Sequence, residues 1–180
     1  MAPDAQPETL EILLEAETIA RRVRELAAQI SADYRGRPLR LLGILKGAWV
    51  FLADLVRQLT FDVTVDFISI ESYGDNSTTT GAVKITKDLD RSIEGLDVLV
   101  VEDILDTGHT FEYLRRVLEA HKPCSLKVVT LLDKPSRRVR PVQADYVGFT
   151  IPDVFVVGYG LDYAQQYRNL PDIRILRKTL

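Results

Sequence analysis

The sequence predicts an α/β fold, in which a central, mainly parallel and twisted sheet is flanked by helices, with a small hood over its C-terminal edge. Two observations carry this prediction. Short apolar runs alternate with helical patterns up to about residue 132, and strand-like runs without helices follow. A chain of 180 residues fits one core, so we expect a single domain spanning 1–180, with a hood built from N-terminal and C-terminal segments.

The first elements follow from apolar spacing. Residues 1–8 carry two prolines and no apolar period, which indicates a loose N-terminus. From Glu8 to about Ile30, apolar residues recur at intervals of three and four, which predicts one helix. A turn at Arg35–Pro38 precedes a buried strand over Leu39–Leu45 and a helix over Trp49–Leu59.

The middle of the chain contains a strand and then a long polar stretch. Apolar residues alternate over Phe61–Phe67, and all periodicity is lost over 71–82. A loop of this length is either a lid over a site or a mobile surface segment, and we expect a flexible active-site loop over 71–86. The remaining predicted elements are strands at Leu96–Val101, Lys127–Leu132, Asp145–Ile151, Phe155–Gly158 and Ile173–Leu176, and a helix over Phe111–Leu118.

Charge and cysteine content narrow the class of protein. The formal net charge of −3 disfavours a general nucleic-acid binder, because neutralising phosphates needs a basic face. The single cysteine, Cys124, cannot form an intramolecular disulfide and suits a reducing cytoplasm. The N-terminus does not resemble a signal peptide, and no apolar run is long enough to cross a bilayer. We therefore expect neither a nucleic-acid nor a membrane partner.

The stretch Val98–Thr110 (VLVVEDILDTGHT) predicts a Mg²⁺-dependent site for a ribose 5-phosphate group. Its buried strand ends in Glu102 and Asp103, and ligands of open α/β sheets sit beyond the carboxyl ends of strands. Adjacent carboxylates there bind sugar hydroxyls or the waters around a hard cation. Asp106–Thr110 directly precede a helix, where successive N–H groups bind an anion and Gly108 permits a close approach.

A simpler interpretation of this stretch is that Asp106 or Thr107 caps the following helix. We expect such capping as well. It does not explain three carboxylates within five residues at a strand end, where like charges repel unless a ligand or a metal offsets them.

The segment VVEDILDTGHT resembles the phosphoribosyl pyrophosphate (PRPP) motif of type I phosphoribosyltransferases. Further segments resemble the hypoxanthine-guanine branch of that family, in the family's order: LLGILKGAWVFLADL its pyrophosphate loop, ESYG…TTTGAVKITKDLD its flexible loop, and LLDKPSRR and PDVFVVGYGLDYAQQYRNLP its purine pocket. The resemblance covers nearly the whole chain from Leu41. It implies the type I phosphoribosyltransferase fold and an enzyme that transfers the phosphoribosyl group of PRPP to a 6-oxopurine, hypoxanthine or guanine, giving IMP or GMP and pyrophosphate.

The resemblance also implies a role for each residue that matches a family motif. Asp106 matches the catalytic residue that accepts a proton at purine N7, and Ser72 and Tyr73 match a lid dipeptide that covers the reacting centre. The implied ligand contacts are those of PRPP with Glu102, Asp103, Asp106, Thr107, Gly108, His109 and Thr110; of pyrophosphate with Lys46, Gly47 and Arg168; of the purine with Lys134, Phe155, Val156 and Asp162; and of Mg²⁺ with Glu102, Asp103 and Asp162. His109 occupies a variable position and is assigned no catalysis.

Base recognition depends on Lys134, which matches the lysine that donates to the purine 6-oxo group. Such a donor favours hypoxanthine and guanine over adenine, which presents an amine there. Taken alone, Lys134 would be a solvent-exposed lysine in a basic run, and Phe155 and Val156 would be core residues.

Three questions stay open at the level of sequence. The preferred base could instead be xanthine, or the chain could be a PRPP-sensing regulator that binds nucleic acid through a basic surface. The family is commonly dimeric or tetrameric, so we expect a homodimer or homotetramer, in which Trp49 and its helix face either a partner or the core. In the family, the peptide that corresponds to Leu45–Lys46 can be cis.

Overall fold

The computed structural model describes residues 8–73 and 82–178. Its central sheet has the strand order β4-β3-β2-β5-β6-β7, and neighbours are parallel except for β4, which is antiparallel to β3. The strands are β2 (Leu39–Leu45), β3 (Val63–Tyr73), β4 (Ala82–Lys87), β5 (Asp97–Leu105), β6 (Ser125–Asp133) and β7 (Tyr146–Thr150). The predicted mainly parallel sheet is therefore confirmed.

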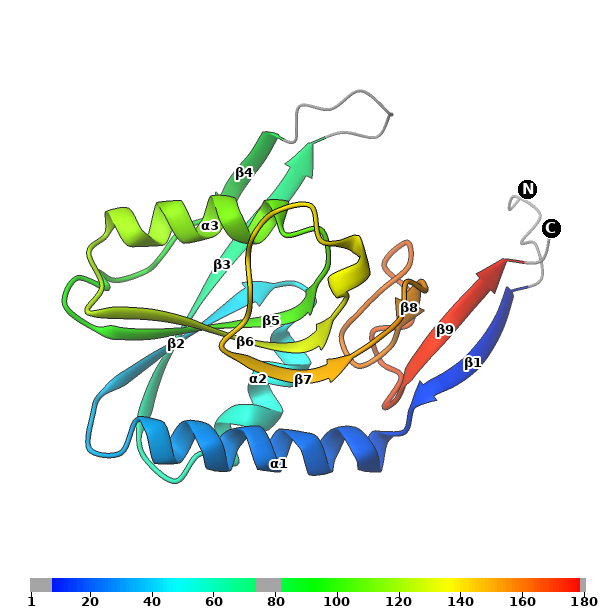
Figure 1. The fold of residues 1–180 in the computed structure, drawn as a ribbon, viewed down its shortest axis with the longest axis horizontal. Helices are drawn as coiled ribbons and strands as arrows, with labels where there is room; N and C mark the ends of the chain where they lie inside the picture. Colours follow the sequence, from blue (N-terminus) through cyan, green and yellow to red (C-terminus); the bar gives the residue numbers. More distant parts are fainter. Residues whose placement is uncertain (1–7, 74–81, 179–180) are drawn as a thin grey trace.

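Helices cover both faces of this sheet (Figure 1). α1 (Ala16–Asp33) and α2 (Trp49–Val56) pack on one face, and α3 (His109–Ala120) packs on the other. Successive side chains of a strand point to opposite faces of the sheet, so Leu99 packs with α1 and Val100 packs with α3. This explains why the central strands are continuously apolar in sequence. No helix in the described ranges is long and apolar enough to cross a membrane.

A second, three-stranded sheet forms the hood next to the carboxyl ends of β2, β5 and β6 (Figure 1). It consists of β1 (Glu8–Leu14), β9 (Ile173–Lys178) and β8 (Val156–Val157), in that order and all antiparallel. The predicted hood is confirmed. Between β6 and β7 lies a short 3-10 helix, η1 (Pro135–Arg137).

Residues 8–14 were predicted as the start of a helix, and this prediction is wrong. They form β1, and the first helix begins only at Ala16. The strand forms because its backbone pairs with β9 at the other end of the chain, Glu8 lying opposite Lys178. Pairing partners so far apart in sequence decide β structure more strongly than local spacing does.

The predicted loop over 71–86 is only partly described. Residues 71–73 and 82–86 belong to β3 and β4 instead of an irregular segment, with Ser72 opposite Val83 and Tyr73 opposite Ala82. Residues 74–81, and residues 1–7 of the predicted loose N-terminus, lie outside the described residues.

A buried carboxylate, Asp66, holds β3 to its surroundings. Burial by itself would raise the pKa of Asp66, but the N–H groups of Phe67 and Asp90 donate to its oxygens at 2.7 and 3.0 Å. Lys87 and Arg40 lie 3.7 and 3.8 Å away, and together these partners bring the pKa of Asp66 below its usual value. A lowered folded-state pKa contributes stability above the unfolded-state pKa, and this stability is lost as pH falls through the folded-state pKa.

We expect Asp66→Asn to lower the free energy of unfolding at pH 7 by about 2–3 kcal/mol, because charged hydrogen bonds are lost. The difference from wild type should shrink towards pH 3, which urea unfolding at both pH values would measure. Asp90→Asn is the matched control, because the Asp90 side chain is exposed and its pair with Lys87 contributes at most about 1 kcal/mol. An Asp66 variant whose deficit stayed constant between the two pH values would contradict this assignment.

Candidate active site

Two adjacent carboxylates lie near the C-terminal end of β5. Glu102 and Asp103 belong to the strand itself, which continues to Leu105 instead of ending before them as predicted. Burial raises the pKa of Glu102 well above its usual value and the charge of Asp103 raises it further, while burial also raises the pKa of Asp103. Oε2 of Glu102 is buried without a hydrogen-bond partner in the described part of the chain. A bound cation would offset the repulsion between the two carboxylates. A cation or a sugar hydroxyl would also give Oε2 of Glu102 the partner that it lacks.

Residues Asp106–Thr110 join β5 to the start of α3, and we call them the α3 turn. Gly108 is the N-cap residue, with φ of 88°, and no side chain caps the helix. The expected capping by Asp106 or Thr107 is therefore wrong. Only glycine fits at position 108, because an added Cβ would lie 2.5 Å from Cγ2 of Val142 in a left-handed backbone conformation.

The backbone of the α3 turn presents free donors. Within residues 8–73 and 82–178, the N–H groups of Asp106, Thr107 and Gly108 have no acceptor. They lie at the N-terminus of a 12-residue helix, where the helix dipole adds partial positive charge. This combination suits an anion such as a phosphate.

The side chain of Asp106 faces an arginine. Nε of Arg137 lies 3.2 Å from Oδ1 of Asp106, at ion-pair distance but without hydrogen-bond geometry. Arg137 also approaches Asp153, with 3.6 Å between Nη1 and Oδ1. Arg137 was not singled out in the sequence, where it was one of several basic residues in a run.

The segment after β2 packs directly against the carboxylate of Asp103. The Leu45–Lys46 peptide is cis. A Cβ added to Gly47 would lie 1.6 Å from Oδ2 of Asp103, and one added to Gly160 would lie 2.3 Å from the carbonyl oxygen of Gly47. The backbone at Gly47 is thus held between Asp103 and Gly160. Gly160 was missed in the sequence, although the pair of glycines around Tyr159 was a signal for close backbone approach.

The residues predicted to bind pyrophosphate meet through a glutamine. Arg168 donates from Nη1 to the carbonyl oxygen of Gly160 at 2.7 Å and pairs with Oδ1 of Asp162 at 2.7 Å. Oε1 of Gln165 lies 3.4 Å from both Nζ of Lys46 and Nη2 of Arg168. The structure therefore brings Lys46, Arg168 and Asp162 together. Gln165 had no distinguishing sequence signal.

Lys134, which is predicted to bind the purine, lies beside the start of the α3 turn. Leu105 and Asp133 pair at the ends of β5 and β6. The residues that follow them, Asp106 and Lys134, are therefore neighbours along the backbone register. Lys134 is only 4% exposed and donates from Nζ to the carbonyl oxygen of Val154 at 2.5 Å. The simpler interpretation of Lys134 as a surface lysine is therefore wrong.

Phe155 and Val156 differ in burial. Val156 is buried in β8, whereas Phe155 is 52% exposed, so Phe155 is not a core residue. The ring of Phe155 meets Tyr163 edge-on, with 5.7 Å between ring centroids. An exposed, oriented aromatic face is suited to stacking with a planar base.

The structure gives little information on two predictions, the lid dipeptide and the Mg²⁺ ligands. Ser72 and Tyr73 lie at the end of β3, and their side chains are not described, so the lid stays a prediction. In the described ranges, no three His, Cys, Asp or Glu side chains cluster into a metal site. Mg²⁺ commonly uses one or two carboxylates together with waters and substrate phosphates, and Glu102 with Asp103 fits that pattern.

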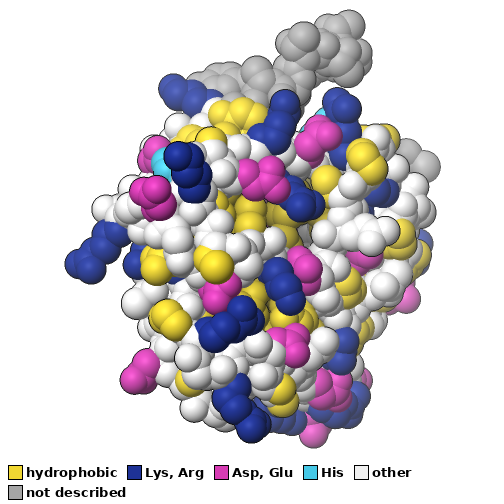
Figure 2. All heavy atoms as spheres, turned by 60° about the vertical axis from the view of Figure 1, so that its left-hand side comes forward, with side chains coloured by type: hydrophobic (Ala, Val, Ile, Leu, Met, Phe, Trp, Pro, Cys, Tyr) yellow, Lys and Arg dark blue, Asp and Glu magenta, His cyan; other side chains and the backbone are white. Residues whose placement is uncertain are grey.

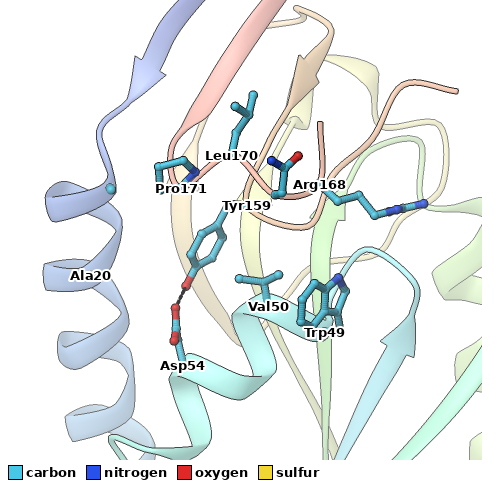
Figure 3. A pocket seen from close by; sticks show the side chains of 10 residues that line it. Ala20, Trp49, Val50, Asp54, Tyr159, Arg168, Leu170 and Pro171 are labelled. Atoms are coloured by element: carbon cyan, nitrogen blue, oxygen red, sulfur yellow. Dashed lines mark hydrogen bonds between the residues drawn. The ribbon is translucent and has the colours of Figure 1, made fainter. Parts of the chain in front are cut away.

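A cavity of about 520 Å³ lies behind Arg168, between α1, α2 and residues 168–171 (Figure 3). The hydroxyl of Tyr159 donates to Oδ2 of Asp54 at 2.6 Å across it, which ties the hood to α2. Trp49 lines the cavity and is 49% exposed, so it does not face the core. No residue of the α3 turn lines this cavity, and of the residues predicted to bind a ligand only Arg168 lines it.

Charges of both signs are mixed on the face shown in Figure 2. Lys and Arg side chains lie beside Asp and Glu side chains there and do not gather into one basic surface. This face therefore lacks the feature that a nucleic-acid-binding regulator would need.

Comparisons with known proteins agree with this geometry. The family model of the phosphoribosyl transferase domain, which describes the sequences of that family, matches residues 9–164. The chain is 47% identical over 169 residues to the hypoxanthine-guanine phosphoribosyltransferase of Bacillus subtilis (strain 168), covering 94% of both chains. It is 49% identical over 167 residues to that of Staphylococcus aureus (strain Mu50), covering 93% of both. A crystal structure of a hypoxanthine-guanine phosphoribosyltransferase from Bacillus anthracis superposes with a TM-score of 0.88 at 46% identity, covering 95% of this chain and 100% of that one.

Proposed function

The chain belongs to the phosphoribosyltransferase family, and we propose that it transfers the phosphoribosyl group of PRPP to hypoxanthine or guanine, giving IMP or GMP and pyrophosphate in purine salvage. The family resemblance predicted from the sequence is thereby confirmed. The observation that supports a 6-oxopurine as the acceptor is the burial of Lys134, which directly follows β6 where Asp133 pairs with Leu105, the residue before Asp106. A buried lysine is retained where its donors have acceptors, and the 6-oxo group of the purine would supply one beyond Val154.

The α3 turn binds the 5′-phosphate in this proposal. Three N–H donors without acceptors and the helix dipole support it. Asp106 then accepts a proton from purine N7 as the base attacks, and Phe155 and Val156 hold the base by stacking and by backbone contacts. Lys46, Gly47 and Arg168 bind pyrophosphate, on which negative charge grows in the oxocarbenium-like transition state.

Mg²⁺ is the proposed cofactor. Glu102 and Asp103 would hold it, and the unpartnered, buried Oε2 of Glu102 supports this assignment. No third carboxylate clusters with Glu102 and Asp103 in the described residues, so Asp162 would join them only after releasing Arg168 and moving closer. When bound, the ion would neutralise charge on the leaving pyrophosphate.

The remaining parts of the proposal concern the whole chain. Residues 1–180 act as one domain, and the loop over 71–86, with Ser72 and Tyr73, closes over the reacting centre to exclude water. We place the protein in the cytoplasm, where the exposed thiol of Cys124 stays reduced.

A Mg²⁺-dependent assay of pyrophosphate release from PRPP with hypoxanthine, guanine and xanthine tests this function. We expect turnover of the first two bases and its loss with EDTA. Xanthine far ahead of both would establish the xanthine-preferring alternative. Tight RNA or DNA binding without pyrophosphate release would establish the regulator.

We expect Lys134→Met to reduce kcat/KM for hypoxanthine by about 10- to 100-fold, because a charged hydrogen bond to the 6-oxo group is removed. The KM for PRPP should change little, which steady-state kinetics with each substrate varied would show. Lys127→Met is the matched control, since Lys127 lies near the start of β6, the strand that Lys134 follows. Equal losses towards both substrates would contradict a role confined to the base.

We also propose that the chain forms a homodimer or homotetramer through the face that carries Trp49. Its half-exposed ring beside an apolar cavity wall supports this. Trp49 is the only tryptophan, so its fluorescence should shift to shorter wavelength as protein concentration rises, in parallel with the mass from sedimentation. Trp49→Lys should yield monomers. A wild-type monomer at micromolar concentration would contradict the proposal.

A further inference from the structure

Three successive carbonyl groups at the end of β5 are held by the segment after β6. The oxygen of Leu105 accepts from the N–H of Lys134 at 3.0 Å and from Nη2 of Arg138 at 3.1 Å. The oxygen of Asp106 accepts from Nε of Arg138 at 2.8 Å. The oxygen of Thr107 accepts from the N–H groups of Val139 and Arg140, at 3.0 and 3.2 Å. All three carbonyls therefore point towards this one segment.

The orientation of these carbonyls fixes the orientation of the donors that follow them. In a trans peptide the N–H points opposite to the C=O of the same peptide plane. The peptides here are trans, since Leu45–Lys46 is the only cis bond within the described ranges. The N–H groups of Asp106, Thr107 and Gly108 consequently point away from Arg138, and none of the three has an acceptor in the described residues.

Arg138 is itself fixed in place. Nη1 donates to the carbonyl oxygen of Val142 at 2.5 Å, and Nη2 pairs with the carboxylate of Asp133. Its side chain is only 15% exposed. A planar guanidinium that spans two peptide planes of the turn and the end of β6 holds them in a rigid relation, which a lysine with its single ammonium cannot reproduce.

We propose that Arg138 is a positioning residue that orients the N–H groups of the α3 turn towards the 5′-phosphate. It does so from behind the turn, without touching the substrate. The inference rests on the proposed function, in which the α3 turn binds that phosphate. From the sequence alone, the arginines that follow Lys134 had no assigned role. One of them, Arg138, now has one.

Binding of IMP and inosine by calorimetry separates this role from a merely structural one, because the two ligands differ only in the 5′-phosphate. We expect Arg138→Met to weaken IMP binding by roughly 10- to 100-fold and inosine binding by less than about threefold, as displaced donors no longer meet the phosphate. The KM for PRPP should rise by a similar factor with little change in KM for hypoxanthine. Arg138→Lys should not restore IMP binding, since it keeps the charge but loses the planar fork.

Arg140→Met is the matched control. Arg140 lies on the same segment, but within the described residues its side-chain polar contacts are with His109 and Glu112, and its backbone donor survives the substitution. Wild-type IMP affinity in Arg138→Lys, or equal weakening of IMP and inosine in both Arg138 variants, would overturn the inference. If wild-type protein bound IMP no more tightly than inosine, the proposed phosphate site itself would fail, which is a different outcome.

Discussion

We expect Asp106→Asn to lower kcat by about 100- to 10,000-fold, the range for removal of a general base. The amide keeps the size of the carboxylate but accepts no proton from purine N7. The KM for PRPP should change much less, because the backbone donors of the α3 turn remain.

Asp153→Asn is the control for this experiment. Both aspartates approach Arg137, at 3.2 and 3.6 Å, so a loss caused only by freeing Arg137 would occur in both variants. We expect Asp153→Asn to keep kcat within about threefold of wild type, as for a half-exposed ion pair. Similar losses in the two variants would mean that Asp106 acts through Arg137.

The second large effect concerns Gly47. We expect Gly47→Ala to lower kcat/KM for PRPP by about 100-fold or more, because the new Cβ would lie 1.6 Å from Oδ2 of Asp103. Either the Lys46–Gly47 backbone or the carboxylate must then move by more than 1 Å, and a displacement of that size commonly costs about 100-fold. Steady-state kinetics with PRPP varied at saturating hypoxanthine measures the effect.

Gly36→Ala separates steric displacement from the general cost of replacing glycine. Gly36 has φ of 74° and no neighbour within 4 Å of an added Cβ. That variant should lose about 1 kcal/mol of stability and keep its activity. If Gly47→Ala were as active as wild type, the packing of Asp103 on this backbone could not matter for PRPP.

The central sheet could be predicted because its information is local. Residues that follow one another in β5, such as Leu99 and Val100, are all apolar since both faces of the strand are buried. The information for the motif at the end of β5 is local too, because Glu102, Asp106 and Gly108 are close together in sequence. A site made of consecutive residues at a strand end is visible without a structure.

The contributions that the sequence hid are long-range. No residue near Leu10 or Ile12 indicates that this segment pairs with β9. The apolar spacing typical of a helix also extends through β1, so the sequence does not show where the strand ends and the helix begins. Arg138 stands in a basic run in which only one arginine turns inward, and burial of a charge depends on partners such as Asp133. Gly160 meets Gly47 across more than a hundred residues, a contact that local periodicity cannot encode.

The pairing of β1 with β9 has a consequence for how the molecule is made. Contacts between residues far apart in sequence form late, because closing a long loop costs entropy before the contact is gained. On the ribosome, β5, α3 and β6 emerge well before β9, so the sheet and the α3 turn can fold first. Val156 and Val157 obtain their strand partner only when β9 follows. We therefore expect a nascent chain to acquire its 5′-phosphate side before its base side, so that base selection is the last property completed during synthesis.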